Sequence, residues 1–263
     1  MLKEEITVGS GPAVRSIAIR HRDRAAGTQA TMPGFVWLGG YRSDMEGSKA
    51  VALDHMAGEI GAACTRFDYS GHGASGGKFV DGTISRWLEE SLAVFDHVTS
   101  GAQILVGSSM GAWIALKLVE TLSGRGQSPR VAGLLLIAPA PDFTSDLMEP
   151  ALTEEQRRDL DTKGFYEEPT PYGPEPNVYT RQLFEDGHEN RVLTGPITTH
   201  CPVHIIQGMA DPDVPYAHAL KLAEHLGGDS VVMTLIGDGD HRLSRPRDIA
   251  LILRTARDLA AIT

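Results

Sequence analysis

The strongest constraint on the fold of this 263-residue chain is a regular alternation of short apolar runs with longer segments of helical periodicity. The runs are nearly continuous, which is typical of parallel strands covered on both faces. They predict strands at Phe35–Gly39, Cys64–Tyr69, Ile104–Gly107, Val131–Ala138, Val203–Gly208 and Val231–Ile236. The periodic segments predict helices at Lys49–Ile60, Ile84–Val98, Gly111–Leu122, Tyr216–Leu226 and Pro246–Ala261. The alternation therefore predicts an α/β fold with a mostly parallel sheet and helices on both faces.

The N-terminal region shows a weaker alternation of apolar and polar residues. Ile6 and Val8 are followed by Val14, Ile17 and Ile19. Such a pattern is typical of antiparallel strands, so we expect a hairpin at one edge of the sheet. With the six runs above, the hairpin makes an eight-stranded sheet. The length of the chain fits one large α/β domain that spans residues 1–263.

Residues 142–202 interrupt this rhythm. The segment is rich in proline, has no apolar run of a buried strand, and carries two short helical patterns near Thr153–Lys163 and Tyr179–Gly187. So long an excursion between strands is typical of an active-site cap or lid. Large side chains in it could line a pocket or hold the insertion onto the body: Phe143, Leu147, Phe165, Tyr166, Tyr172, Tyr179 and Phe184. The candidate substrate-binding residues are Gly40, Phe143, Leu147, Phe165 and Tyr179.

The segment Gly107-Ser108-Ser109-Met110-Gly111 lies between a predicted strand and a predicted helix, and it matches G-x-S-x-G with Ser109 at the centre. A serine at so sharp a turn takes a backbone conformation with positive φ, and flanking glycines avoid collisions with neighbouring backbone. The turn exposes Oγ, and N–H groups at the start of the helix can stabilise a negative charge. The segment indicates a nucleophile elbow, although small residues also ease the packing of a helix on a strand.

A serine nucleophile needs a base and a carboxylate that orients the base. In this architecture the chain order is serine, acid, histidine. Asp211 follows a predicted strand, and His241 lies in a Gly-rich loop after the last one. Strand ends are where an open α/β sheet places its site. We therefore predict Asp211 as the acid, in preference to Asp213, and His241 as the base, with His72 as the alternative histidine.

Two backbone amides are the candidate donors of an oxyanion hole. One is the amide of Met110, directly after the serine. The other belongs to the loop Leu38-Gly39-Gly40-Tyr41, where paired glycines permit close approach and the Tyr41 amide can point inward. Two glycines are also explained by turn formation alone.

Other kinds of site are disfavoured by spacing or context. The acidic residues around His241 lack the spacing of a known cation-binding loop, so neither a metal nor another cofactor is expected. Residues 71–76 match G-x-G-x-x-G, but residues 78–82 separate this motif from the next predicted helix, which disfavours a dinucleotide site. No Gly-Lys-Ser/Thr closes the elbow, which disfavours a P-loop.

Together these motifs resemble the α/β-hydrolase superfamily, and within it the mitochondrial acyl-glucuronide esterases and palmitoyl-protein thioesterases. The resemblance begins near Phe35 and rests on five stretches: Gly40 to Ala50, Arg66 to Ser75, Gln103 to Trp113, Gly208 to Pro215 and Asp240 to Arg242. It implies Ser109 as nucleophile, Asp211 as acid, His241 as base, and the amides of Tyr41 and Met110 as oxyanion donors. It further implies hydrolysis of carboxylic esters and thioesters, including acylated cysteine and acyl glucuronides.

Composition narrows the possible partners. A formal net charge of −10 provides no basic footprint for nucleic acid or an anionic membrane. No apolar run approaches the roughly 18 residues of a membrane helix, so no integral membrane association is expected. The N-terminal residues lack the apolar core of a signal peptide, which predicts cytoplasmic localisation. Cys64 and Cys201 are expected to be unpaired thiols.

These features predict a cofactor-free serine hydrolase that cleaves a small-molecule or lipid-acyl ester or thioester through an acyl-enzyme. Three alternatives stay open. A C–C hydrolase or peptidase would share the same triad, a ligand-binding module could use the same fold without catalysis, and a scaffold could bind a protein partner through the insertion. A monomer or a homodimer is expected.

Overall fold

One sheet organises the molecule. The computed structural model describes residues 2–29, 32–171, 174–228 and 230–262. Eight strands follow the order β1-β2-β4-β3-β5-β6-β9-β10. Six of them run parallel: β3 (Gly34–Leu38), β4 (Cys64–Phe67), β5 (Gln103–Ser108), β6 (Val131–Ile137), β9 (Val203–Gly208) and β10 (Val231–Ile236). The expected edge hairpin is formed by β1 (Leu2–Val8) and β2 (Arg15–Arg22), and β2 is antiparallel to β4. The predicted eight-stranded, mostly parallel sheet is confirmed.

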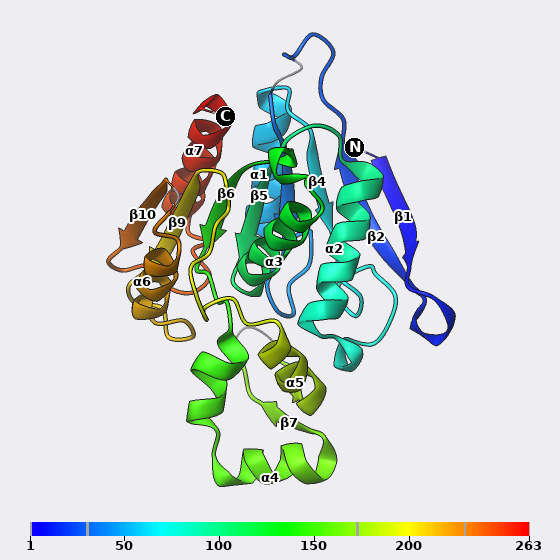
Figure 1. Ribbon diagram of the computed structural model, residues 1–263, viewed down its shortest axis with the longest axis vertical. Coiled ribbons are helices and arrows are strands. Elements are labelled where there is room, and N and C mark those ends of the chain that lie inside the picture. The colour runs from blue at the N-terminus through cyan, green and yellow to red at the C-terminus, as the bar shows by residue number, and fades with distance from the viewer. Residues whose placement is uncertain (1, 30–31, 172–173, 229, 263) are drawn as a thin grey trace.

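Helices cover both faces of this sheet, as predicted. Figure 1 shows α2 (Ile84–Val98), α3 (Met110–Gly124) and α6 (Tyr216–His225) in front of it, with α1 (Ser48–Glu59) and α7 (Pro246–Ile262) behind. The pleat of each strand supplies both cores. In β3, Val36 and Leu38 pack into the front core while Phe35 and Trp37 pack into the rear one. Strands buried on both faces explain why their sequences are continuous apolar runs.

The insertion after β6 carries secondary structure of its own. It contains α4 (Glu154–Lys163), a hairpin of β7 (Phe165–Glu168) and β8 (Asn177–Thr180), and α5 (Arg181–Glu189). Figure 1 shows α4, β7 and α5 together at one end of the molecule, beyond the sheet. Both predicted helices are present, but the second begins two residues late because Tyr179 and Thr180 belong to β8. The hairpin was not predicted.

Short helical turns complete the chain. They are η1 (Gly11–Ala13), η2 (Phe79–Asp81), η3 (Ser128–Arg130), η4 (Thr144–Met148) and η5 (Glu149–Ala151).

Asp142 fastens the insertion at its base. Its side chain is fully buried, and its carboxylate accepts hydrogen bonds from the amides of Val192 at 2.9 Å and Leu193 at 2.8 Å. These partners lie 50 and 51 residues further along the chain. Because buried carboxylates need such donors, Asp142 holds the two ends of the insertion together.

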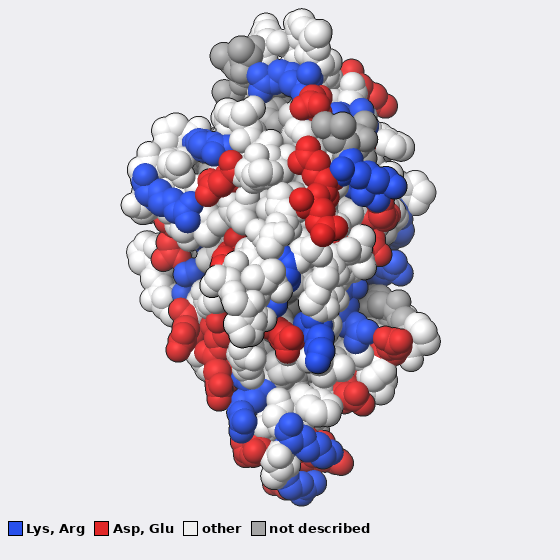
Figure 2. Space-filling model, turned by 90° about the vertical axis from the view of Figure 1, so that its right-hand side faces the viewer, with Lys and Arg blue, Asp and Glu red and all other residues white. Residues whose placement is uncertain are grey.

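The surface carries mixed charge on the face seen in Figure 2. Acidic and basic side chains alternate there without a continuous basic area. Among the helices of the described residues, none has the length and apolarity to cross a membrane. Cys64 and Cys201 are buried and form no disulfide with each other, as expected.

Candidate active site

Ser109 occupies the turn between β5 and α3. Its φ of 54° and ψ of −119° confirm the predicted positive φ. Both flanking glycines are required by close backbone contacts. A Cβ at Gly107 would lie 2.6 Å from the Gly111 carbonyl oxygen, and a Cβ at Gly111 would lie 2.0 Å from the Leu38 carbonyl oxygen. The strained turn therefore depends on these two glycines and holds Ser109 at the end of the sheet.

Replacing Gly111 by alanine is expected to lower the free energy of unfolding by about 3 kcal/mol, because the new methyl group would collide with rigid backbone. The sign is informative, since alanine normally favours a helix over glycine by about 1 kcal/mol. Gly124→Ala in the same helix is the matched control, because a Cβ there meets nothing within 4 Å. Urea unfolding should show a loss for Gly111→Ala and no loss for Gly124→Ala. Equal midpoints would contradict the close contact.

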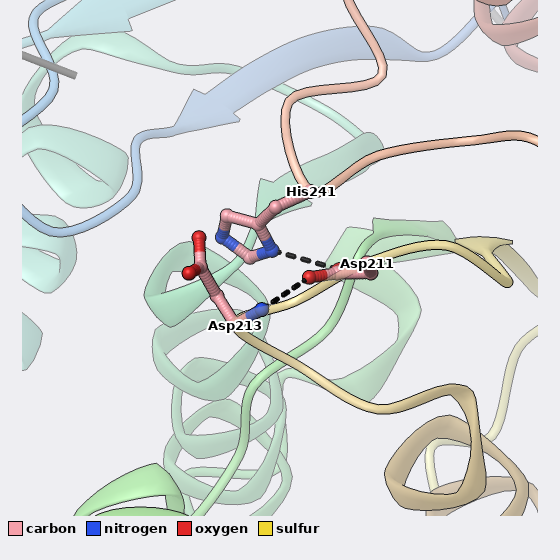
Figure 3. A group of neighbouring side chains, drawn as sticks. All are labelled: Asp211, Asp213 and His241. Atoms are coloured by element: carbon pink, nitrogen blue, oxygen red, sulfur yellow. Dashed lines mark hydrogen bonds and ion pairs between the residues drawn. The ribbon is translucent and has the colours of Figure 1, made fainter. Parts of the chain in front are cut away.

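The structure brings Ser109, His241 and Asp211 into one hydrogen-bonded series. His241 Nε2 lies 3.0 Å from Ser109 Oγ, and its Nδ1 lies 2.8 Å from Asp211 Oδ2. Asp211 follows β9 and His241 follows β10, so neighbouring strand ends position them (Figure 3). An ionised carboxylate can only accept, so Nδ1 carries the proton and Nε2 presents its lone pair to the serine hydroxyl. The imidazole is thus set to receive a proton from Ser109.

Asp211 is held in place by four hydrogen bonds. Oδ1 accepts from the amides of Asp213 and Val214, both at 2.9 Å, while Oδ2 accepts from Gln207 Nε2 at 3.1 Å and from His241. Burial alone would raise the pKa of Asp211, but the bond and charge attraction to His241, with the two amide bonds, lower it overall. Of the two predicted carboxylates, Asp211 is therefore the one that contacts the imidazole in the ionised form. Asp213 is exposed and contributes its amide.

Two carboxylates and the imidazole lie close together at the end of β9 and β10, as ligands of a metal ion would. Ligand atoms of Asp211, Asp213 and His241 lie within 4.8 Å of one another. However, each oxygen of Asp211 already accepts two hydrogen bonds, and one of these comes from His241 Nδ1. A cation would have to displace these donors, so the arrangement suits an oriented imidazole better than a cation.

The loop of Gly40 and Tyr41 packs directly against the elbow. A Cβ at Gly40 would lie 3.2 Å from the Ser108 carbonyl oxygen and 3.3 Å from Ser109 Cβ. The Ser43 amide donates to the Gly40 carbonyl at 3.1 Å, which closes a turn around Tyr41. On the other side, α3 begins at Met110, whose N–H has no acceptor within the helix. The two predicted oxyanion donors thus belong to segments on either side of Ser109.

His72, the alternative histidine, forms its hydrogen bonds with the backbone of Ser70 and Arg42. It is 4% exposed, and its Nδ1 lies 3.1 Å from the Ser70 carbonyl oxygen while its Nε2 accepts from the Arg42 amide at 3.2 Å. Burial lowers its pKa to about 4, with a small contribution from the Arg42 charge and opposed by the bond to Ser70. His72 is therefore neutral at neutral pH and engaged at both nitrogens.

This buried histidine predicts a specific acid sensitivity. The folded pKa of about 4 lies below the unfolded value of 6.5, so the unfolded state binds more protons between these pH values. As pH falls through this window, His72 should remove up to about 3 kcal/mol from the free energy of unfolding. Measured by urea unfolding, the stability advantage of wild type over His72→Phe should narrow from pH 6.5 to pH 4. A difference that does not depend on pH would contradict a buried neutral His72.

The candidate substrate-binding residues fall into separate places. Tyr41 stacks on Tyr179 with ring centroids 5.2 Å apart, and Phe143 lies edge-on to Tyr41 at 6.1 Å. Leu147 instead lines a cavity of about 520 Å³ beside α6, together with Pro215. These positions divide the candidates between an aromatic cluster next to the loop of Gly40 and Tyr41 and the cavity beside α6.

Phe165 lies apart from both groups. It is 39% exposed, whereas the next residue, Tyr166, is buried because successive residues of β7 point to opposite faces. Tyr172, another large side chain of the insertion, lies outside the described residues.

One supporting residue was missed from the sequence. Gln207 is fully buried at the end of β9, and its amide donates to Asp211 Oδ2 and to the Val214 carbonyl at 3.0 Å. The available signal was a polar residue inside the otherwise apolar strand Val203–Gly208.

Known proteins share this chain's sequence and fold. Residues 32–251 match the alpha/beta hydrolase family. The Homo sapiens protein named palmitoyl-protein thioesterase ABHD10, mitochondrial, is 33% identical over 229 residues, which cover 86% of this chain and 72% of the human one. The structure of mouse alpha/beta hydrolase domain-containing protein 10 superposes with a TM-score of 0.82 at 31% identity, covering 97% of this chain and 98% of the mouse chain. The crystal structure of a protein from Agrobacterium vitis S4 that is named as a hydrolase superposes on this chain with a TM-score of 0.95. The two sequences are 58% identical, and the match covers 98% of each chain. The chain therefore belongs to the alpha/beta hydrolase family.

Proposed function

We propose that this hydrolase cleaves carboxylic esters or thioesters through an acyl-enzyme formed on Ser109. The observation that carries the proposal is the hydrogen-bonded series from Asp211 through His241 to Ser109, with the serine at a strained elbow. The names of the relatives, palmitoyl-protein thioesterase among them, support an acyl substrate.

In the acylation half, Ser109 Oγ attacks the acyl carbonyl carbon while His241 Nε2 takes the hydroxyl proton. The carbonyl oxygen becomes an oxyanion that accepts hydrogen bonds from the amides of Tyr41 and Met110. Collapse of this intermediate breaks the bond to the leaving oxygen or sulfur, and the imidazolium donates its proton to that atom. The ionised Asp211 stabilises the imidazolium throughout.

In the deacylation half, water takes the place of Ser109 as the nucleophile and Ser109 Oγ becomes the leaving group. His241 removes a proton from water, the resulting hydroxide attacks the acyl-enzyme carbonyl, and the same two amides bind the second oxyanion. Collapse releases the carboxylic acid and returns the proton to Ser109 Oγ. No cofactor takes part in either half-reaction.

We further propose that the acyl chain lies against the rings of Tyr41, Phe143 and Tyr179. The rings of Phe143 and Tyr179 contact the ring of Tyr41, whose amide is one of the proposed oxyanion donors. The chain of an acyl group bound at these donors would therefore begin beside the three rings. Apolar ring faces favour an alkyl or aryl chain over a charged one.

A substrate panel tests this function. Rates should be measured for p-nitrophenyl esters and acyl-cysteine thioesters of increasing chain length, next to peptide amides and a β-diketone that reports C–C cleavage. The proposal predicts hydrolysis of esters and thioesters, with kcat/KM rising as the acyl chain lengthens. Cleavage confined to the peptides or the diketone would favour the alternative chemistries. Saturable ligand binding without any turnover would favour a binding module.

A further inference from the structure

His72 is buried directly beneath the loop that carries the Tyr41 amide. Since the Ser70 carbonyl can only accept and the Arg42 amide can only donate, Nδ1 must carry the proton and Nε2 must accept. This assignment agrees with a neutral side chain. His72 therefore offers the Arg42 amide a hydrogen-bond acceptor from outside the loop.

The loop itself needs such support. Arg42 is a non-glycine residue with φ of 56°, a left-handed conformation that is intrinsically unfavourable for it. Its amide belongs to the peptide group that begins at the Tyr41 carbonyl, so its orientation limits how the Tyr41 residue can turn. On the outer side, the Tyr41 hydroxyl donates to the Val178 carbonyl, and the Arg42 guanidinium pairs with Glu175 at 3.1 Å. The hydrogen bond that the Arg42 amide donates to His72 Nε2 is the corresponding contact on the inner side.

His72 is itself rigidly held. Its ring lies edge-on to Phe79 at 5.0 Å, to Trp87 at 5.5 Å and to Tyr69 at 5.7 Å. These rings fix the position of the imidazole and separate it from water. They leave its two nitrogens directed at the two backbone partners.

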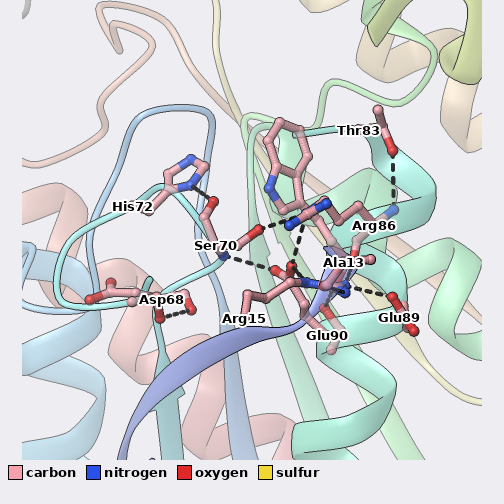
Figure 4. Close-up of polar contacts among 12 residues, drawn as sticks. Ala13, Arg15, Asp68, Ser70, His72, Thr83, Arg86, Glu89 and Glu90 are labelled. Carbon is pink, nitrogen blue, oxygen red and sulfur yellow. Dashed lines mark hydrogen bonds and ion pairs between the residues drawn. The ribbon is translucent and has the colours of Figure 1, made fainter. Parts of the chain in front are cut away.

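Ser70, whose carbonyl accepts the hydrogen bond from His72 Nδ1, is itself bonded to a buried ion pair. The Ser70 amide donates to Glu90 Oε2 at 2.9 Å, and Glu90 Oε1 accepts from Arg15 Nε at 2.6 Å. Figure 4 shows this series of contacts running from Arg15 on β2 and Glu90 on α2 to Ser70 and His72. The Arg15 and Glu90 side chains are almost completely buried. Contacts between separate elements therefore determine where the imidazole lies.

We propose that His72 is a positioning residue for the oxyanion hole, holding the Arg42 amide so that the Tyr41 N–H points at the developing oxyanion. The inference rests on the proposed function of Ser109. An oxyanion exists in the transition state and not in the bound substrate, so loss of this contact should lower kcat and leave KM nearly unchanged. A residue needed only for stability would not produce that division.

The test compares His72→Phe, which keeps a ring but has no acceptor, with His72→Gln, whose amide can accept from Arg42 and donate to Ser70. Against the best ester of the panel, His72→Phe is expected to lower kcat by about 10- to 100-fold with little change in KM. Affinity for a trifluoromethyl ketone, which forms a tetrahedral adduct with the serine, should fall by the same factor. His72→Gln should restore much of both. His204→Phe, which removes a histidine contact to Thr234 between β9 and β10, is the control and should not change kcat.

Hydrogen exchange of residues 39–43 provides a readout that needs no turnover. His72→Phe should accelerate exchange in this segment, whereas Ser109→Ala should not. Unchanged kcat and unchanged exchange in a folded His72→Phe protein would overturn the positioning role and leave the hydrolase proposal intact. A different result would overturn the hydrolase proposal instead: wild type neither hydrolyses the substrates nor reacts with a fluorophosphonate at Ser109, while residues 39–43 still exchange faster in His72→Phe than in wild type. If His72→Phe does not fold, His72→Leu replaces it in each comparison.

Discussion

Replacing Ser109 by alanine is expected to lower turnover of the best ester substrate by about 10⁴ or more. The change removes the hydroxyl that lies 3.0 Å from His241 Nε2, so no acyl-enzyme can form. The oxyanion amides and the binding surface remain, and they should leave a small residual rate above the uncatalysed one. The elbow itself should persist, because alanine can take the place of serine without adding atoms. Initial rates under saturating substrate measure the effect.

Ser108→Ala is the matched control for this change. Ser108 is the neighbouring serine at the end of β5, and it is buried rather than bonded to His241. Its replacement should alter turnover far less than that of Ser109. Similar losses in both variants, or an unchanged rate in Ser109→Ala, would remove Ser109 from the mechanism.

Asp211→Asn is expected to lower kcat at neutral pH by about 10⁴. The amides of Asp213 and Val214 require an acceptor at the Oδ1 position, so the new NH₂ group must occupy the Oδ2 position. From there it would donate to His241 Nδ1, which shifts the imidazole proton to Nε2, and the bond that Gln207 Nε2 donates to Oδ2 in wild type would be lost. The base would then present a proton, not a lone pair, to Ser109. A crystal structure of the variant should show the substituted side chain in the position of the Asp211 side chain, while initial rates show the loss of kcat.

The variant Asp213→Asn tests which of the two neighbouring carboxylates, Asp211 or Asp213, orients His241. Asp213 contributes its backbone amide to Asp211, and this contact survives the substitution. We expect kcat to change by less than about tenfold. A loss in Asp213→Asn that matches the loss in Asp211→Asn would show that the acid has been assigned to the wrong residue.

The sheet was largely predictable from the sequence because its inner strands, such as β3 and β5, are buried on both faces. The strands Val203–Gly208 and Val231–Ile236 have the predicted bounds, since each is a largely apolar run between turn residues. The hairpin of β7 and β8 could not be predicted in the same way. Of the four residues of β7, only Tyr166 is buried, and no apolar run or regular alternation identifies the strand. The position of the hairpin depends on contacts that Val178 of β8 and the preceding Glu175 make with Tyr41 and Arg42, more than 130 residues earlier in the chain.

The reactive residues of the candidate site also follow from local signals. Ser109 lies in a glycine-flanked turn, while Asp211 and His241 lie in the loops after two strands that pair in parallel. The contacts of neighbouring polar residues could not be predicted in this way. His72 accepts a hydrogen bond from Arg42, 30 residues earlier in the chain, and Gln207 donates to Asp211 within the turn after β9, and only the folded structure reveals these contacts.

The most direct test of an activated Ser109 is intact-protein mass spectrometry after reaction with a fluorophosphonate, followed by peptide mapping. Wild type is expected to gain one adduct on Ser109, His241→Ala to label far more slowly, and Ser109→Ala not to label. Labelling of another residue in wild type, or an equal rate in His241→Ala, would contradict a serine activated by His241.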